Sequence, residues 1–184
     1  MKILFNKIRN LIFYLLGEIK RRSLSSKWIK RNKNKNFSII CNSCVGGVIY
    51  HDLGLEFLSP TINMYLNPLD LIRFASNLKY YCSLDLQFIE TDEPHPVAML
   101  DDITLYFNHS KTEDDAERDW NRRKKRINYE NLYLILFYWD GYTIEQIREI
   151  EKVPCKKAVV LTYKPLGLDY EVYMVGNGDP KKTF

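Results

Sequence analysis

Cys44 is the residue whose position most directly suggests chemistry. It lies in residues 37–47 (FSIICNSCVGG), where an apolar run typical of a β-strand ends in small polar residues and a Gly-Gly pair. Residues 48–53 then have the pattern of a helix start, and a strand followed by a helix places side chains and backbone N–H groups at the carboxyl edge of a sheet. A thiol at a helix N-terminus has a lowered pKa, so we expect Cys44 to be a catalytic nucleophile.

His109 is a candidate general base for this thiol. It lies in the segment Phe-Asn-His-Ser at the end of another predicted strand, and Asp101 or Asp102 is a candidate orienting carboxylate. A Cys–His pair with a carboxylate or amide orienter supports acyl transfer or hydrolysis through a thioester. The alternative is that Cys44 is a small turn residue and His109 caps a helix, because single Cys and His residues are weak signals.

Metal chemistry has less support in the sequence. Cys41 and Cys44 form a Cys-x-x-Cys motif, but no second pair of cysteines or histidines follows at metal-ligand spacing. We therefore predict no metal site, and the sequence leaves any other cofactor unknown. Asp101 and Asp102 are adjacent, as are the acidic metal ligands of some glycosyltransferases. An Asp pair without further motif residues is weak evidence for a metal site.

A helix predicted over residues 112–127 supplies candidate substrate-binding residues. Trp120 and Arg123 share one face at helical spacing, and Arg126 is adjacent to that face. If this face packs inward, Arg123 is partly buried and needs an anion. That anion is either the carboxylate of Asp119, one helical turn earlier, or the phosphate of a nucleotide sugar or lipid carrier.

Two further residues are candidate contacts for substrate hydroxyls. Asp140 follows residues 131–139, the most hydrophobic segment of the chain, which predicts a central strand covered on both faces. A polar residue there lies at the carboxyl edge of the sheet, although an ordinary Asp-Gly turn is an equally good reading. Asn63 lies just after a Ser-Pro-Thr segment and adds a polar contact.

The elements that position these residues alternate between strand and helix. Strands are predicted over residues 37–41, 86–89, 97–100, 103–107, 131–139, 158–163 and 170–175, and helices over residues 48–53, 69–82, 112–127 and 144–152. Ser110 with Glu113, and Thr143 with Gln146, have the spacing of capping boxes. This alternation predicts a single three-layer α/β domain over residues 37–184, and the direct strand-to-strand connections predict a mixed β-sheet.

Charge is distributed unevenly along the 184 residues. Residues 1–36 contain eleven Lys and Arg and one acidic residue, whereas the remaining chain contains 16 basic and 22 acidic residues. The net charge of +4 therefore comes from the N-terminus, and we predict no nucleic-acid partner. Four cysteines give no disulfide framework and no cleavable signal peptide is recognised, which favours the cytoplasm.

Residues 1–36 read as a separate basic segment. Residues 1–20 have apolar side chains at helical spacing, and their longest uncharged run, residues 10–17, is far short of the roughly 20 residues that span a bilayer. An amphipathic helix followed by a polybasic stretch suits an anionic membrane surface, so we predict peripheral association with the inner face of the membrane. The alternative is a helix that packs on the core, followed by a solvated linker.

Four motifs resemble a bacterial family catalogued as domain of unknown function 1919. They are LGL-x-F-x-SPT at residues 53–61, NL-x-YY at residues 77–81, F-x-H at residues 107–109 and W-x-x-R-x-x-RIN at residues 120–128. The resemblance covers about residues 37–173. Members of that family are commonly labelled exopolysaccharide or capsule biosynthesis proteins, so the resemblance implies an α/β fold and a role in surface-polysaccharide assembly. It carries no established catalytic residues.

These observations lead to one preferred function and two alternatives. The preferred function is an exopolysaccharide or capsule transferase that transfers an acyl group to a saccharide or lipid-linked saccharide, using Cys44 and His109. A glycosyltransferase that uses a nucleotide sugar is the second reading, with an acid and Arg123 against the diphosphate. A non-catalytic module that binds carbohydrate or tethers an assembly complex is the third.

Overall fold

The computed structural model describes residues 21–139 and 141–174. The chain forms two compact units, one comprising Met1–Lys35 and Val48–Glu56 and the other comprising Asn36–Gly47 and Phe57–Phe184. The predicted helix over residues 1–20 lies outside the described residues, and the predicted boundary at residue 36 stays a prediction.

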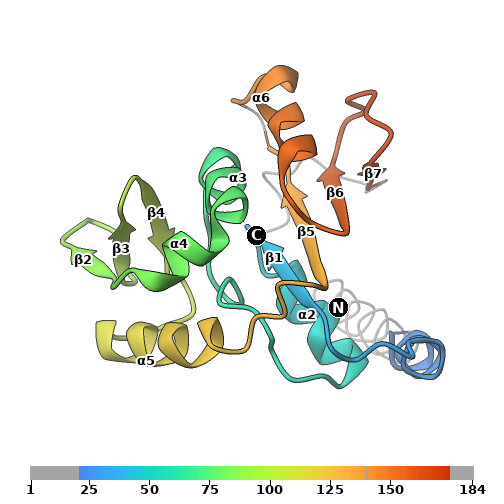
Figure 1. Ribbon diagram of the computed structural model, residues 1–184, viewed down its shortest axis with the longest axis horizontal. Coiled ribbons are helices and arrows are strands. Elements are labelled where there is room, and N and C mark those ends of the chain that lie inside the picture. The colour runs from blue at the N-terminus through green and yellow to red at the C-terminus, as the bar shows by residue number, and fades with distance from the viewer. Residues whose placement is uncertain (1–20, 140, 175–184) are drawn as a thin grey trace, which may run out of the picture. The chain divides into compact units, whose positions relative to one another are not determined.

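The larger unit contains two β-sheets (Figure 1). The first has the order β1-β5-β6-β7 and consists of β1 (Ser38–Cys41), β5 (Leu132–Phe137), β6 (Lys157–Thr162) and β7 (Glu171–Tyr173). The second has the order β2-β3-β4 and consists of β2 (Gln87–Ile89), β3 (Val97–Leu100) and β4 (Ile103–Tyr106). All pairs of the first sheet are parallel and all pairs of the second are antiparallel. The α/β class is confirmed, with the two pairing types divided between two sheets.

Helices connect and cover these strands. They are α2 (Val45–Leu53), α3 (Pro68–Ser76), α4 (Leu78–Ser83), α5 (Glu113–Lys124) and α6 (Ile144–Arg148), the last continued by a 3-10 turn over Glu149–Lys152. Helix α3 contacts β1 and β5 of the first sheet and β4 of the second, so it joins the two sheets into one core. Leu71 and Phe74 on α3 are fully buried, as their helical spacing predicted.

Local signals explain most helix boundaries. Asn67 precedes α3 and Pro68 occupies its first turn, where the missing N–H of proline costs nothing. Thr143 and Gln146 form the predicted capping box of α6. For α5 the predicted capping box is wrong: the N-cap is Thr112, whose side chain accepts a hydrogen bond from the backbone N of Asp115 at 3.2 Å. The helix predicted over residues 69–82 is divided at Asn77 into α3 and α4.

Strand β5 lies at the centre of the first sheet, between β1 and β6. Alternate residues of β5, including Leu134 and Leu136, are buried, whereas the residues between them are half-buried. The central position is as predicted. Full burial of both faces is not observed.

The smaller unit contains a helix over residues 21–31 and most of α2. Arg21 donates hydrogen bonds to both carboxylate oxygens of Asp52, the shortest at 2.7 Å. The Arg21 guanidinium holds the pKa of the Asp52 carboxyl below its usual range. Trp28 and Ile29 on the first helix are 47% and 44% exposed and lie among exposed lysines. Within the described ranges, no helix combines the length and the apolar character that crossing a bilayer requires.

Candidate functional site

The thiol of Cys44 and the imidazole of His109 are in direct contact. The Sγ atom of Cys44 lies 3.1 Å from the Nε2 atom of His109, within the range of a sulfur hydrogen bond. Cys44 is half-buried and His109 is exposed, so the pair lies at the surface of the larger unit. This distance meets the geometric requirement for a nucleophile and its general base.

A buried asparagine fixes the backbone just before Cys44. Asn42 follows β1 and is fully buried, and its side chain pairs with the backbone of Phe137 at the end of β5. The Asn42 Nδ2 donates to the Phe137 carbonyl at 3.0 Å, and the Phe137 N–H donates to Asn42 Oδ1 at 2.7 Å. The Asn42 side chain thus continues the hydrogen bonding between β1 and β5 one residue beyond the end of β1. This contact fixes the point at which the loop to Cys44 leaves the sheet.

The segment 59–63 is tied to the same end of β1. The backbone N–H of Cys41 donates to Thr61 Oγ1 at 3.0 Å, and Ser59 and Thr61 hydroxyls lie 3.2 Å apart. Ser59 and Thr61 are both fully buried. Their bonds to each other and to β1 satisfy polar groups that would otherwise be costly to bury. The Ser-Pro-Thr segment therefore holds the following residues beside the Cys44 loop.

Two glycines allow a close approach between the start of α2 and this segment. A Cβ atom on Gly47 would lie 3.0 Å from Asn63 Oδ1, and one on Gly46 would lie 3.3 Å from Ile62 Cδ1. Both distances are shorter than ordinary van der Waals contact. Asn63 itself has φ of 61°, a left-handed conformation that asparagine tolerates better than most residues. The Gly-Gly pair is thus explained by packing against residues 62–63.

His109 is presented by a tight turn between β4 and α5. The backbone N–H of Phe107 donates to the Pro96 carbonyl at 2.9 Å, and the N–H of Ser110 donates to the Phe107 carbonyl at 2.8 Å. Thr112 then caps α5. Both ends of the turn are fixed by hydrogen bonds, so the imidazole is held at the edge of the second sheet, where it meets the loop after β1.

The electrostatics of Cys44 differ from the prediction. Burial raises the pKa of the Cys44 thiol above its ordinary value, whereas its position before a helix predicted a lowered pKa. The cause is desolvation, because a half-buried thiolate loses part of its hydration. The Cys44 thiol is thus a weaker acid than an exposed cysteine.

Asp102 does not orient His109, and this prediction is corrected. Asp102 lies in the turn between β3 and β4, where the Tyr81 hydroxyl donates to its Oδ1 at 2.6 Å and Arg73 Nε lies 4.0 Å from its Oδ2. The neighbouring Asp101 accepts from the Tyr80 hydroxyl at 2.8 Å. Both carboxylates thus hold α4 against the hairpin. Within the described part of the chain, His109 has no hydrogen-bonding partner besides Cys44.

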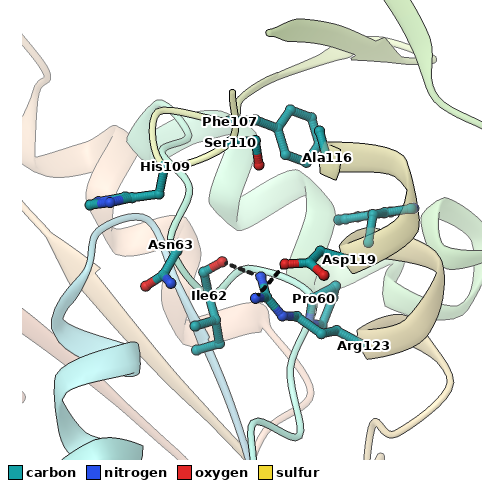
Figure 2. A pocket seen from close by; sticks show the side chains of 10 residues that line it. Pro60, Ile62, Asn63, Phe107, His109, Ser110, Ala116, Asp119 and Arg123 are labelled. Carbon is teal, nitrogen blue, oxygen red and sulfur yellow. Dashed lines mark hydrogen bonds and ion pairs between the residues drawn. The ribbon is translucent and has the colours of Figure 1, made fainter. Parts of the chain in front are cut away.

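A small pocket is lined by His109, though not by Cys44, and gathers several predicted residues. Its volume is about 40 Å³, and it is lined by Pro60, Ile62, Asn63, Phe107, His109, Ser110, Ala116, Asp119, Trp120 and Arg123. Figure 2 shows His109 and Asn63 on one side and Asp119 and Arg123 of α5 opposite them. Four predicted residues from three separate segments of the sequence, Asn63, His109, Trp120 and Arg123, therefore line one cavity.

Arg123 is buried and largely paired with protein atoms. Its exposed fraction is 9%, and it donates to the Ile62 carbonyl at 2.9 Å and to Asp119 Oδ2 at 2.8 Å. Of the two anions that the sequence predicted for Arg123, the structure therefore shows the carboxylate of Asp119. Burial lowers the pKa of the Arg123 guanidinium, and Asp119 opposes that effect. Its planar group also lies 5.6 Å from the centre of the Phe57 ring.

Two N–H groups of the pocket residues are buried without an acceptor among the described residues. They are Nε1 of Trp120, a residue only 2% exposed, and Nε of Arg123. Leaving such a donor unpaired costs about 1–3 kcal/mol, so native proteins rarely do so without reason. Both donors belong to residues that line the cavity.

The remaining predictions have separate outcomes. Arg126 is half-buried but does not line the pocket. Asp140 lies outside the described residues. Sequence analysis did not name Asn42, although its place directly after a strand was the available signal. Ser110 was noted only as a cap, and the pocket shows it as a lining residue.

The structure offers no clear metal-ligand cluster. Over residues 21–139 and 141–174, no three His, Cys, Asp or Glu side chains converge as metal ligands would. Cys41 is fully buried, forms no disulfide among the described residues and lies 3.4 Å from the Ser43 hydroxyl, and burial raises the pKa of its thiol. The Cys-x-x-Cys pair therefore divides into one core residue and one surface residue.

Comparison with known proteins places the chain in an uncharacterised group. Residues 16–181 match the family described as Domain of unknown function (DUF1919). A protein of Haemophilus influenzae described as uncharacterized is 35% identical over 132 residues, which cover 72% of this chain and 64% of that protein. The chain thus spans less than two thirds of that relative's length.

Proposed function

Since this chain belongs to the DUF1919 family, we propose that it is a cysteine-dependent acyltransferase that acts on a saccharide in exopolysaccharide or capsule biosynthesis. The observation that carries the proposal is the 3.1 Å contact between Cys44 Sγ and His109 Nε2 at the edge of a pocket. The polysaccharide part rests on the motifs at residues 53–61 and 107–128, which resemble proteins labelled for that role.

The geometry supports a two-step transfer. His109 Nε2 takes the thiol proton as Cys44 Sγ attacks the carbonyl carbon of an acyl ester or thioester, and the leaving group departs with a proton from the imidazolium. A thioester on Cys44 results. His109 then takes the proton of a saccharide hydroxyl, the oxygen attacks the thioester carbonyl, and the proton passes to the departing sulfur. No proton is gained or lost over the two steps.

The described residues favour acyl transfer over transfer of a sugar from a nucleotide. The cavity lined by His109 and Arg123 has a volume of about 40 Å³, far below the roughly 300–1,000 Å³ of pockets that hold drug-sized ligands, and the larger hollow of about 580 Å³ beside Tyr80 and Tyr129 includes neither His109 nor Arg123. Arg123, the candidate partner for a diphosphate, is already paired with Asp119. Asp101 and Asp102, the candidate metal ligands, accept hydrogen bonds from tyrosines.

A non-catalytic binding module is the second candidate. It is favoured by the raised pKa of Cys44 and by the missing orienting partner of His109 among the described residues. In this reading the thiol and imidazole form a polar surface contact. The same pocket then binds a small group without turning it over.

We further propose that the protein acts at the inner face of the membrane. Trp28 and Ile29 are exposed on a helix whose neighbouring Lys27, Lys30 and Arg31 are also exposed. Apolar side chains among basic ones suit the interface of an anionic membrane. Replacing both residues by serine (Trp28→Ser with Ile29→Ser) is expected to lower pelleting with phosphatidylserine vesicles. Unchanged pelleting would contradict this part of the proposal.

The test of the proposed function compares surface polymers. A source strain lacking the gene is complemented with the natural protein, with Cys44→Ser or with Cys155→Ser, and acyl substituents are measured by NMR of the purified polymer. Cys155 is the matched control because it is also half-buried, its pKa is also raised by burial and, among the described residues, its thiol makes no hydrogen bond to a histidine.

Each outcome has a distinct meaning. The proposal predicts that Cys44→Ser yields polymer of normal length without ester-linked acyl groups, whereas Cys155→Ser restores them. Normal acylation with Cys44→Ser would support the binding module. Loss of the polymer itself with Cys44→Ser would support a role in chain assembly instead.

A further inference from the structure

A second hollow, with a volume of about 580 Å³, includes neither residue of the Cys–His pair. Its walls come from residues 75–80 at the junction of α3 and α4, from Tyr129, Glu130 and Leu132 at the start of β5, and from Pro154. All of these residues belong to the larger unit. The volume falls within the roughly 300–1,000 Å³ of pockets that hold small-molecule ligands, so the hollow is large enough for such a ligand.

Two exposed tyrosines line this hollow. Tyr80 is 49% exposed and Tyr129 is 39% exposed, although both side chains are large aromatic rings. The Tyr80 hydroxyl donates to Asp101 Oδ2 at 2.8 Å, and the Tyr129 hydroxyl interacts with the side chain of Cys82. Because both hydroxyls are engaged by the protein, the exposed surface of each side chain is largely ring carbon.

The two rings are also held in place by their neighbours. The Tyr80 ring meets the Tyr81 ring edge-on, with the ring centroids 5.2 Å apart and an angle of 66° between the ring planes. The Lys79 ammonium lies 5.4 Å from the centre of the Tyr129 ring. A ring that is already fixed by contacts within the protein loses little conformational freedom when a ligand packs on it. The hollow thus offers two pre-ordered apolar surfaces.

The polar side chains of the hollow both donate and accept hydrogen bonds. They are the Asn77 amide, the Lys79 ammonium and the Glu130 carboxylate, and all three residues are exposed. Over the described residues, no side-chain hydrogen bond or ion pair engages Asn77 or Glu130. An ammonium donates, a carboxylate accepts and an amide does both, so these groups suit ligand hydroxyls, which also do both.

The charges at the hollow favour a neutral ligand. Lys79 and Glu130 place one positive and one negative group among the lining residues. An anion is attracted by Lys79 but repelled by Glu130, and a cation meets the reverse. Residues 37–184 contain 16 basic and 22 acidic residues, so the surrounding chain adds no attraction for an anionic polymer.

A sugar ring combines the two properties that these walls favour. Its faces carry C–H groups that pack on aromatic rings, and its edge carries hydroxyls that pair with amides, carboxylates and ammonium groups. A nucleobase also stacks on tyrosine, but a nucleotide brings phosphate charge that this hollow does not attract. The walls therefore favour neutral sugar units over nucleotides.

We propose that this hollow binds neutral sugar units of a saccharide chain, with Tyr80 and Tyr129 as the stacking rings. Asn77, Lys79 and Glu130 hydrogen-bond with the hydroxyls of the sugar. That this saccharide is the acyl acceptor rests on the proposed transferase function, to which the hollow adds the place where the acceptor is held. The binding site itself rests on the residues that line the hollow.

The test measures binding of sugar fragments to the full chain. The probes are neutral oligosaccharides released by mild acid from the surface polymer of the source strain, treated with base to remove ester-linked acyl groups, and AMP serves as the comparison ligand. Titration calorimetry gives Kd, and saturation-transfer NMR shows which ligand protons contact the protein. The fragments are expected to bind through the C–H protons of the sugar ring, and AMP is expected to bind at least about tenfold more weakly.

Three variants locate the site. Tyr80→Ala removes a stacking ring and is expected to weaken fragment binding about tenfold. Tyr80→Phe keeps the ring and loses only the hydroxyl bond to Asp101, so its Kd is expected to stay within about twofold of the natural protein. Tyr173→Ala is the matched control, because Tyr173 is 46% exposed on β7 and does not line the hollow.

The outcomes separate this inference from the proposed function. The hollow is overturned if the fragments do not bind, if AMP binds more tightly than they do, or if Tyr80→Ala behaves like Tyr173→Ala. It is also overturned if Tyr80→Phe loses as much binding as Tyr80→Ala, since the hydroxyl and not the ring would then matter. Acylation of Cys44 by p-nitrophenyl acetate, measured on the natural protein, tests the transferase separately. Fragment binding without that acylation would overturn the transferase and leave the saccharide site standing.

Discussion

Cys44 Sγ and His109 Nε2 lie 3.1 Å apart although the residues are 65 positions apart in the chain. Cys44 follows β1 of the parallel sheet and His109 follows β4 of the antiparallel sheet. Helix α3, which contacts both sheets, belongs to the core that holds these two strand ends together. The contact therefore depends on how the two sheets pack, and no local sequence pattern specifies it.

The reactivity of the Cys44 thiol with pH follows from its burial. Because burial raises the pKa of Cys44, the thiol is half ionised only at a pH above the ordinary midpoint of about 8.5. We expect the rate of alkylation by iodoacetamide, measured on the Cys44 peptide, to rise with pH through a midpoint above that value. A midpoint near 6 would show a preformed thiolate–imidazolium pair and contradict the general-base mechanism.

The second prediction concerns Gly47. In Gly47→Ala the new Cβ would lie 3.0 Å from Asn63 Oδ1 and 3.3 Å from Ile62 Cγ2, so the Asn63 amide must move. Alanine favours a helix by about 1 kcal/mol over glycine, which offsets much of the clash. We expect the midpoint of urea unfolding to change little, whereas acylation of Cys44 falls several-fold. A large loss of stability with unchanged chemistry would show that the glycine serves only the fold.

Asn42 is predicted to matter for stability. Asn42→Ala leaves the N–H and carbonyl of Phe137 without their side-chain partners, which costs about 2–4 kcal/mol if each group loses a buried hydrogen bond. Asn42→Asp keeps an acceptor for the Phe137 N–H, but it buries a carboxylate whose second oxygen faces the Phe137 carbonyl oxygen, so its loss is expected to be at least as large. Urea unfolding measures both. Equal stability of the natural protein and Asn42→Ala would show that the loop before Cys44 is held by other contacts.

Arg122 and Arg123 form a matched pair of probes on α5. Each donates to Asp119 at 2.8 Å, but the Arg122 side chain is 53% exposed and the Arg123 side chain is 11% exposed. We expect Arg123→Ala to lower the free energy of unfolding by about 1–3 kcal/mol, because it leaves the buried Ile62 carbonyl without its side-chain donor and removes one of the two guanidinium partners of Asp119. Arg122→Ala is expected to cost less than about 0.5 kcal/mol. Similar losses for the two variants would contradict the assigned burial.

Sequence reasoning succeeded where the signal was local. Helical spacing placed Trp120 and Arg123 on one inward face, and the strand pattern before Cys44 placed the thiol at a sheet edge. The predictions that depend on tertiary contacts were wrong. Asp102 was expected to orient His109, but Tyr81 of α4 binds that carboxylate. The lowered pKa of Cys44 was expected from its helix, but the packing around it removes more solvent than a sequence can indicate.

Asn42 illustrates a third kind of limit. An asparagine after a strand reads as a turn residue, and only the pairing of β1 with β5 shows that its amide binds the Phe137 backbone. The cavity likewise needed the structure, because its walls come from residues 60–63, 107–110 and 116–123. Each wall has a recognisable sequence motif, but their convergence is a property of the fold.

The most direct test of the account is whether Cys44 carries the acyl group during turnover. The full chain is mixed with p-nitrophenyl acetate, quenched in acid within seconds, digested and analysed by mass spectrometry, alongside His109→Gln. The account predicts one acetyl group on the Cys44 peptide of the natural protein and a rate about 100-fold lower in His109→Gln, the usual contribution of a general base. Acetyl on Cys155 instead of Cys44, or an equal rate in His109→Gln, would contradict it.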